Sequence, residues 1–222
     1  SPPDLAEEYG RQGADEITLL DVSATPDGRG TRVDTVASVR ERVALPLTVG
    51  GGVRSADDAA ALLEAGADKV GVNTAAVERP ALLEELAARY GRQCTVLAVD
   101  AARRPGGGGF EVVVRSGRDR IGGDAVAWAR RAAELGAGEI LLTSWDRDGT
   151  GAGYDLELIA AVAAAVDVPI VASGGGATAA HMAAAVDAGA DAVLAASIFH
   201  DRRCTVGDIK RELAELGVEV RP

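Results

Sequence analysis

The sequence predicts a (β/α)8 TIM barrel of the α/β class, built from two half-barrel repeats. Short apolar segments alternate with helical ones at intervals of roughly 20 to 30 residues, which favours right-handed βαβ units and a parallel sheet covered on both faces. The two halves of the chain also resemble each other at an offset of about 123 residues. Finally, polar turns follow the strands at their carboxyl ends, where barrels bind their ligands.

Three pairs of segments carry the internal repeat. Asp-Glu-Ile at 15–17 matches Gly-Glu-Ile at 138–140, and the triple glycine at 50–52 matches that at 174–176. Gly-Ala-Asp-Lys-Val at 66–70 likewise matches Gly-Ala-Asp-Ala-Val at 189–193. Two copies of a four-strand unit would close into one eight-stranded barrel.

The first half begins with a helix and alternates from there. Ser55 is expected to cap a helix whose first turn holds Asp57 and Asp58, and Pro80 suits the first turn of another. Helices are expected at 5–12, 33–43, 55–65 and 80–90, and strands at 16–20, 46–49, 69–72 and 94–99.

The second half contains an insertion before it resumes the alternation. Residues 103–109 read as a basic, glycine-rich loop, and 110–114 alternate like an exposed strand of a small hairpin, expected to form a flap near the strand ends. Helices are then expected at 124–135, 156–165, 177–188 and 206–216, and strands at 139–143, 169–172 and 192–195.

This count gives seven barrel strands where eight are needed. The repeat places the partner of the strand ending at Asp100 before Ser1, so a first strand with an equivalent carboxylate is expected to be missing. No long linker divides the chain, and residues 1–222 are expected to form a single barrel domain. Because an unclosed barrel exposes two edges, a polypeptide starting at Ser1 is expected to be poorly soluble and inactive; a soluble, monomeric, active sample would refute this.

Composition excludes several classes of partner. The net charge of −11 argues against nucleic acid or an anionic membrane, but leaves a small anionic ligand held by local amides. No apolar run approaches the roughly 20 residues of a membrane span and no signal peptide is evident, so a cytoplasmic protein is expected. Cys94 and Cys204 lack zinc-site spacing and are expected to be reduced thiols, while His181 and His200 are expected to be surface or capping groups. No metal or cofactor is expected.

Two glycine-lined sites for phosphate are predicted at the carboxyl ends of the strands. Bare backbone N–H groups in such turns can approach an anion, although a glycine cluster alone fits an ordinary tight turn equally well. Together the two sites would suit a long ligand with a phosphate at each end. The first comprises Gly52, Asn73 and Thr74, and the second Ser173, Gly174, Gly175, Ala196 and Ser197.

Carboxylates at the same end are the candidate chemical groups. Asp100 closes an otherwise apolar strand, where it could act as an acid or base or cap the next turn. Asp146 and Asp148, followed by Gly149, could bind ligand hydroxyls or a cation, or form an Asp-rich turn that satisfies its own backbone.

Four motifs together resemble the cyclase subunit of imidazole glycerol phosphate synthase, and the similarity covers essentially all 222 residues. They are Leu-Thr-Val-Gly-Gly-Gly-Val at 47–53, Val-Asn-Thr-Ala-Ala-Val at 72–77, Leu-Leu-Thr-Ser-Trp-Asp-Arg-Asp-Gly-Thr at 141–150 and Ala-Ala-Ser-Ile-Phe-His at 195–200. The related phosphoribosyl-formimino isomerase shares the glycine turns. It typically has Gly-Thr in place of Asn73-Thr74 and lacks Ser144 and the Tyr154-Asp155 pattern, so the cyclase is favoured.

The resemblance implies a lyase of histidine biosynthesis. Its substrate would be the bis-phosphate PRFAR, which ammonia attacks before ring closure and cleavage to imidazole glycerol phosphate and AICAR. Asp100 matches the family's second catalytic aspartate, Asp148 matches a substrate contact, and the two glycine sites match its phosphate sites. Ammonia would come through the barrel from a glutaminase subunit docked on the amino-terminal face. Four residues match gate or interface positions there, although each could be an ordinary solvated charge: Glu16, Asp68, Lys69 and Glu139.

The chain also departs from the family pattern. The family's first strand, with its catalytic aspartate and a lysine-bearing loop, is absent ahead of Ser1; Ile121 replaces a usual threonine and Ala102 a common lysine. Two alternatives therefore stay open. One is a non-catalytic barrel that binds phosphorylated ligands or a partner, and the other is the isomerase.

Overall fold

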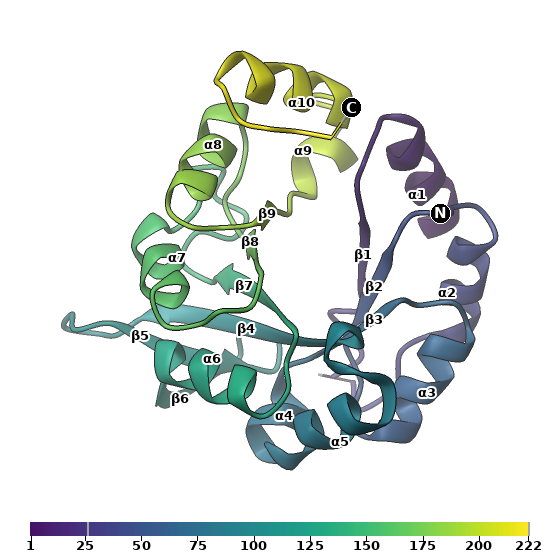
Figure 1. Ribbon diagram of the computed structural model, residues 1–222, viewed down its shortest axis with the longest axis vertical. Coiled ribbons are helices and arrows are strands. Elements are labelled where there is room, and N and C mark those ends of the chain that lie inside the picture. The colour runs from purple at the N-terminus through teal and green to yellow at the C-terminus, as the bar shows by residue number, and fades with distance from the viewer. Residues whose placement is uncertain (26, 222) are drawn as a thin grey trace.

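The computed structural model, which describes residues 1–25 and 27–221, is a strongly curled parallel sheet with helices around its outer face (Figure 1). The strands are β1 (Ile17–Leu20), β2 (Leu47–Gly50), β3 (Lys69–Val72), β4 (Thr95–Arg103), β5 (Phe110–Val114), β6 (Asp119–Asp124), β7 (Glu139–Ser144), β8 (Ile170–Ser173) and β9 (Ala192–Val193). The helices are α1 (Pro2–Arg11), α2 (Val33–Arg40), α3 (Ala56–Glu64), α4 (Thr74–Glu78), α5 (Ala81–Tyr90), α6 (Ala125–Glu134), α7 (Leu156–Ala163), α8 (Ala179–Asp187), α9 (Ser197–His200) and α10 (Val206–Glu215).

The sheet has the strand order of a TIM barrel. Parallel strands follow one another as β1-β2-β3-β4-β7-β8-β9, and β5 and β6 form an antiparallel hairpin on β4. This confirms the (β/α)8-type fold and the count of seven barrel strands. In the described part of the chain, β1 and β9 pair on one side only.

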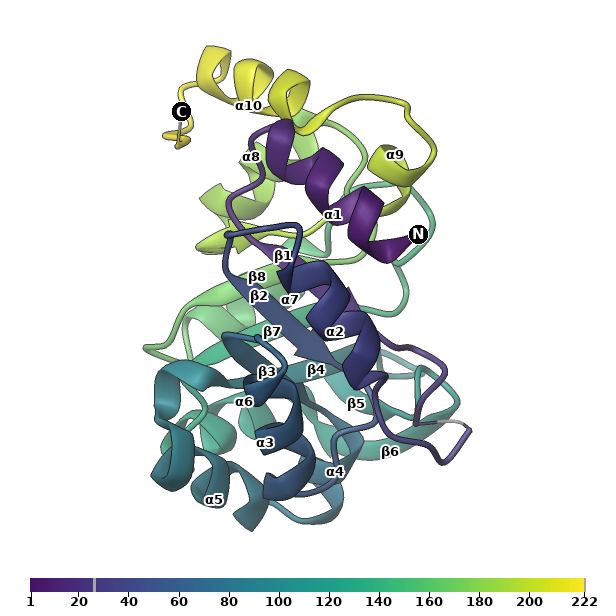
Figure 2. The ribbon, with the colours of Figure 1, turned by 90° about the vertical axis from the view of Figure 1, so that its right-hand side faces the viewer.

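The first helix of the chain contacts the last two helices, next to the edge strands β1 and β9. Helix α1 lies beside α9 and α10 (Figure 2). The Gln12 side-chain oxygen accepts a hydrogen bond from the N–H of Val206 at 3.1 Å, and Lys210 pairs with Asp15 at 2.8 Å. The Tyr9 hydroxyl lies 2.5 Å from the Nδ1 of His200. Within the described residues, side-chain contacts therefore connect the segments beside the two edge strands.

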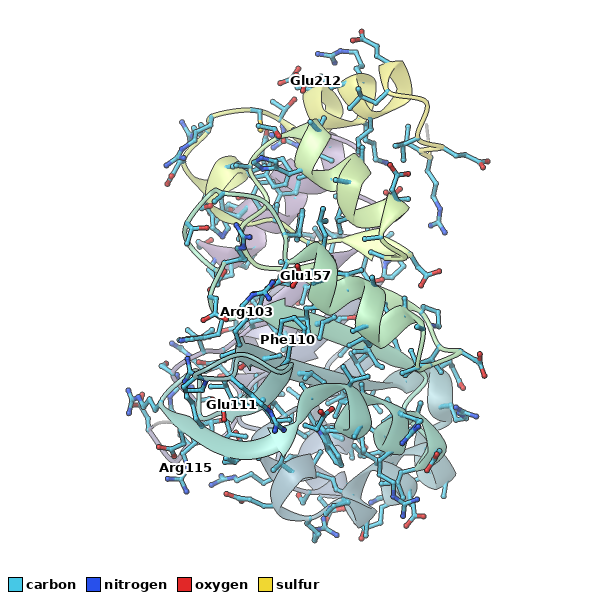
Figure 3. All side chains as sticks on the ribbon, turned by 90° about the vertical axis from the view of Figure 1, so that its left-hand side faces the viewer. Arg103, Phe110, Glu111, Arg115, Glu157 and Glu212 are labelled. Atoms are coloured by element: carbon cyan, nitrogen blue, oxygen red, sulfur yellow. The ribbon has the colours of Figure 1, made fainter. Side chains whose placement is uncertain are left out.

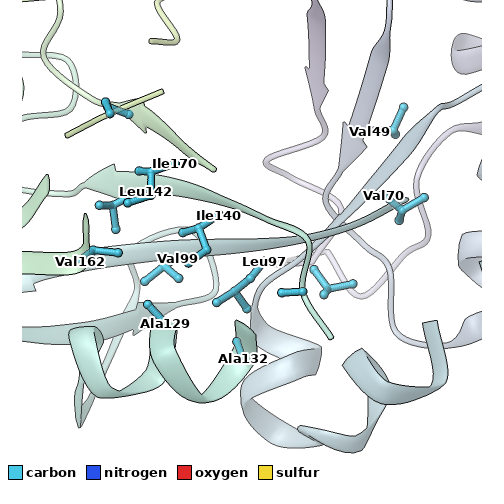
Figure 4. Packing of buried hydrophobic residues seen from close by; sticks show 14 of the residues in the cluster. Val49, Val70, Leu97, Val99, Ala129, Ala132, Ile140, Leu142, Val162 and Ile170 are labelled. Carbon is cyan, nitrogen blue, oxygen red and sulfur yellow. The ribbon is translucent and has the colours of Figure 1, made fainter. Parts of the chain in front are cut away.

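Aliphatic side chains fill the core, as the low aromatic content predicts. All four residues of β2 are buried, and Leu97 and Ile140 are fully enclosed between the sheet and its helices. On α6, Ala129 and Ala132 face these side chains and are themselves completely buried (Figure 4). Small alanines on the helix let it approach the large strand residues closely.

Capping residues and a proline mark the beginnings of two helices, as the sequence predicts. The Ser55 hydroxyl accepts a hydrogen bond from the N–H of Asp58 at 3.1 Å, and the Asp58 carboxylate accepts one from the N–H of Ser55, which confirms the predicted cap of α3. Pro80 was expected in the first turn of α5 and lies one residue ahead of it, at the N-cap.

The region after Asp100 differs most from expectation. β5 was expected to be exposed, but all five of its residues are buried, because β4 and β6 flank it. β4 runs on to Arg103, so the predicted loop at 103–109 begins one residue late. Cys94 lies in a 3-10 turn (Arg92–Cys94) ahead of β4, not in the strand.

Across the described residues, every helix is too short or too polar to cross a membrane.

Candidate active site at the carboxyl ends of the strands

Asp100 lies at the mouth of the sheet, within hydrogen-bonding distance of the residue that follows β3. The side-chain N–H of Asn73 donates to the Asp100 carboxylate at 3.0 Å, so the structure brings together two residues that the sequence placed on neighbouring strand ends. Burial raises the pKa of Asp100 to about 6, and the negative charge of Asp148 acts in the same direction. Hydrogen bonds from Asn73 and Thr143 oppose this rise.

A carboxyl group with this pKa can exchange protons near neutral pH. Its protonated and ionised forms are both populated there, which is the condition for general acid–base catalysis. Two buried polar atoms on the neighbouring strand ends, Asn73 Oδ1 and Ser144 Oγ, have no hydrogen-bond partner among the described residues. Since buried polar atoms are normally paired, these are candidates to contact a ligand.

The three residues predicted to form the first anion site line a cavity. A hollow of about 420 Å³ is lined by Gly52, Asn73 and Thr74, together with Thr25 and the turn of the β5–β6 hairpin. Gly51 has φ +96°, and a Cβ there would lie 2.2 Å from the carbonyl oxygen of Asp21. Only glycine fits this close approach, which leaves the backbone bare at the cavity wall.

The second predicted anion site lies at the ends of β8 and β9. Val171 and Ala192 are paired in register, so Ser173 at the end of β8 and the Ala196–Ser197 turn lie at the same edge of the sheet. A Cβ on Gly174 would lie 2.7 Å from the carbonyl oxygen of Ser144, so this turn too requires glycine.

The loop that carries Asp148 and Gly149 is tied to this second site. The N–H of Gly153 donates to the Gly175 carbonyl at 2.8 Å. The sequence analysis named Tyr154 only as part of a family pattern. In the structure its ring packs against Gly176, and its hydroxyl donates a hydrogen bond to the Leu194 carbonyl at 2.9 Å. Asp148 is exposed on this loop, while Asp146 accepts a hydrogen bond from the N–H of Arg103 at 2.7 Å. Asp146 therefore binds the backbone at the end of β4, not the backbone of its own turn, and neither of the two interpretations left open describes this contact.

Three of the four charged residues predicted for the opposite face converge there. The Lys69 ammonium lies 2.8 Å from the Glu16 carboxylate and 2.6 Å from that of Glu139. Burial lowers the pKa of Lys69, but its hydrogen bonds to Glu139 and Glu16 outweigh this and the net pKa is raised. Asp68 is separate: it accepts hydrogen bonds from Arg40 at 2.5 Å and from the N–H of Leu47 at 2.8 Å.

The β5–β6 hairpin contributes residues that the sequence analysis missed. Figure 3 shows Arg115 on the hairpin and Arg103 beside Glu157, with the Arg103 guanidinium 5.0 Å from the centre of the Phe110 ring. Arg115 and Arg118 both line the 420 Å³ cavity. Arg-Ser-Gly-Arg after a strand was a usable signal, because a short turn that contains glycine indicates a hairpin and this turn also carries two arginines.

Comparison with known proteins agrees with this arrangement. The model of the family described as "Histidine biosynthesis protein" matches residues 1–205. The imidazole glycerol phosphate synthase subunit HisF of Mycobacteroides abscessus is 57% identical over 99% of this chain and 88% of its own length. HisF subunits of Frankia casuarinae and Streptomyces coelicolor are also 57% identical, each over 99% of this chain and 87% of their own length. With its barrel topology and its polar mouth, the chain belongs to the histidine biosynthesis protein family and, within it, to the HisF subunits of imidazole glycerol phosphate synthase.

Proposed function

We propose that this chain is the cyclase of imidazole glycerol phosphate synthase, converting PRFAR and ammonia to imidazole glycerol phosphate and AICAR. The observation that carries the proposal is Asp100: a half-buried carboxyl group with a pKa of about 6, held by Asn73 between two glycine-lined turns. The names of the close relatives support the same activity.

In this proposal, the bis-phosphate lies across the mouth of the barrel. One phosphate occupies the cavity at Gly52, Asn73 and Thr74, and the other binds at Gly175 and Ser197. Asp148 and Gly149 contact the middle of the ligand. Anchoring both ends fixes the reacting atoms relative to Asp100, which lowers the entropic part of the barrier.

Asp100 would carry the proton transfers. Ammonia adds to an electrophilic carbonyl carbon of the substrate, and the ionised carboxylate takes a proton from the nitrogen that has become positive. The carbonyl oxygen leaves as water when the carbon–nitrogen double bond forms. When the ring closes and the carbon–nitrogen bond to AICAR breaks, the protonated form can return a proton to the departing nitrogen. A pKa near neutrality suits both directions of transfer.

The amino-terminal face would receive ammonia from a glutaminase subunit. Lys69, Glu16 and Glu139 form an ion cluster at the start of the strands, where a passage through the barrel would open. We propose this cluster as the gate, and Asp68 with the surrounding rim as part of the docking surface. The close relatives are named as subunits of a synthase, which supports a partner.

The test is PRFAR consumption with an ammonium salt as nitrogen donor, using protein expressed from its full reading frame. Turnover that disappears in Asp100→Asn, but persists in Asp146→Asn, is expected. Folded wild-type protein that binds PRFAR without consuming it would contradict the proposal. Assaying the isomerase substrate would then separate an isomerase from a binding barrel.

A further inference from the structure

The tip of the β5–β6 hairpin forms one wall of the cavity at Gly52 and Thr74. Residues 115–118 connect the two strands, and Arg115 and Arg118 are among the residues that line the cavity. This wall comes from an insertion outside the internal repeat. The internal repeat therefore predicts no equivalent wall at the second anion site.

Three contacts hold this tip in place. The N–H of Arg115 donates to the Thr74 hydroxyl at 3.1 Å, and the Ser116 hydroxyl donates to the Val22 carbonyl at 2.8 Å. Gly117 packs so closely on Trp145 that a Cβ there would lie 1.8 Å from the ring atom Cζ2. The backbone is also left-handed at Arg115 and Ser116, with φ 54° and 53°. Non-glycine residues persist in that conformation when their surroundings impose it.

The two arginines of the hairpin tip differ in whether a carboxylate neutralises them. The Arg115 guanidinium lies 3.3 Å from Asp119 and 3.8 Å from Glu78, so its charge is shared between two carboxylates. Arg54 donates to the Gly28 carbonyl at 3.1 Å. Arg118 is exposed and, among the described residues, pairs with no carboxylate. An uncompensated cation at a glycine-lined cavity is notable in a chain with a net charge of −11.

We propose that Arg118 binds the phosphomonoester in this cavity directly, and that the hairpin tip is the clamp that places it there. A guanidinium offers paired N–H donors that match two phosphate oxygens, and its charge offsets the repulsion between a dianion and an acidic protein. Thr74, the first residue of α4, links the clamp to the site, because its hydroxyl accepts a hydrogen bond from the tip and the residue itself lines the cavity. The inference rests on the proposed function, which supplies the phosphorylated ligand.

The experiment compares Arg118→Ala and Arg118→Lys with Arg130→Ala, which removes an exposed arginine from the outer helix α6. In Arg118→Ala we expect the KM for PRFAR to rise about tenfold with kcat within about twofold of wild type, because a contact made equally in ground and transition states changes KM alone. Arg118→Lys should lie between the two, since an ammonium keeps the charge without the paired donors. Arg130→Ala should match wild type.

The two products give a second readout, because each carries a single phosphate. Arg118→Ala should weaken competitive inhibition by one product about tenfold and leave inhibition by the other unchanged, since only one phosphate reaches this cavity. Equal loss for both products, or for neither, would overturn the inference while leaving the cyclase activity standing. Wild-type protein that shows no binding of PRFAR by calorimetry would overturn the proposed function and this inference together.

Discussion

Asp100 combines burial with a neighbouring negative charge, so the pH dependence of turnover should report its ionisation. Acting as a base, it must be deprotonated, and kcat/KM is expected to rise with pH through an apparent pKa of about 6. Burial is the main cause of the raised pKa of Asp100, and Asp148→Asn removes the negative charge that adds to it, so the acidic limb should move to lower pH. The measurement is the pH–rate profile of both proteins.

A matched control is Asp187→Asn, which removes an exposed carboxylate at the end of α8. This variant should keep the limb at its wild-type position. A limb that does not move in Asp148→Asn would show that the coupling to Asp100 is absent. Activity that falls, rather than rises, through pH 6 would assign Asp100 the role of acid.

The same burial should make Asp100 costly to the fold. Its folded-state pKa of about 6 exceeds the unfolded value of 3.8, so the native state binds the proton more tightly and stability is lost as pH rises through this interval. At pH 8 the ionised carboxylate bears the full cost, on the order of 2–3 kcal/mol at 1.36 kcal/mol per pKa unit. Asp100→Asn should therefore unfold at higher urea concentration than wild type at pH 8, and the gain should shrink toward pH 4. A gain that is the same at both pH values would contradict this explanation.

For single residues, the sequence predicted the positions of the site residues better than their pKa values and contacts. Asp100 lies in β4 and Asn73 directly follows the neighbouring parallel strand β3, and the rule that the carboxyl ends of such strands meet at one edge was enough to pair them. The pKa depends instead on side-chain burial and on the loop that brings Asp148 near, and neither has a periodic signal in the sequence. Asp68 had the right strand-end position, but its contacts with Arg40 and Leu47 arise from the α2–β2 connection.

Among the elements, the β5–β6 hairpin depends on the absence of a side chain at Gly117. A methyl group there would collide with Trp145, at a φ of +84°, and should displace the tip and with it Arg118. Gly117→Ala is expected to raise the KM for PRFAR and to lower the free energy of unfolding by about 1–3 kcal/mol through strain and overpacking. The measurements are steady-state kinetics and urea unfolding, with tryptophan fluorescence as a local reporter.

The hairpin supplies its own control. Gly122 has a φ of +72°, and a Cβ there would have no atom within 4 Å, so Gly122→Ala imposes the backbone strain without the collision. It should leave the KM near wild type. Adding Trp145→Ala to Gly117→Ala should recover part of the lost affinity, because the collision is removed. If Gly122→Ala raised the KM as much, strain alone would explain the effect.

The same hairpin shows why one strand was assigned the wrong environment. Residues 110–114 read Phe-Glu-Val-Val-Val, and their alternation was interpreted as that of an exposed hairpin strand. In the structure the Glu111 carboxylate pairs with Arg120 of β6 at 2.7 Å, so it can be buried on the strand. The partner is nine residues away and across a turn, beyond any alternation pattern. Capping signals act within three or four residues, which is why Ser55 was predicted correctly.

For the whole molecule, the internal repeat gave the sheet topology, because each βα unit has only one right-handed way to follow the last. The repeat could not predict how segments far apart in the chain meet. The Arg115 contact with Thr74 and the contacts between α1 and α10 depend on loop lengths and on individual side chains. The contacts between α1 and α10 join the two ends of the chain beside the edge strands β1 and β9.

Replacing Gln12 would show whether α1 and α10 unfold together as one cooperative unit. Its side-chain oxygen is the acceptor for the N–H of Val206 in the first turn of α10, where a helix has no acceptor of its own. Gln12→Ala should lower the free energy of unfolding by about 1 kcal/mol, the usual net loss for one hydrogen bond. Amide exchange should accelerate in both helices, because this hydrogen bond joins α1 to α10 and, among the described residues, β1 and β9 share no ladder.

Gln93→Ala is the matched control, since the Gln93 side chain is exposed and donates only to Tyr90 within its own turn. It should leave exchange in α1 and α10 unchanged. If Gln12→Ala accelerated exchange in α10 alone, the two helices would open independently and each edge of the sheet would be held by its own neighbours. Acceleration in both helices, extending into β1 and β9, would mean that the contact between α1 and α10 stabilises the curled sheet as a whole.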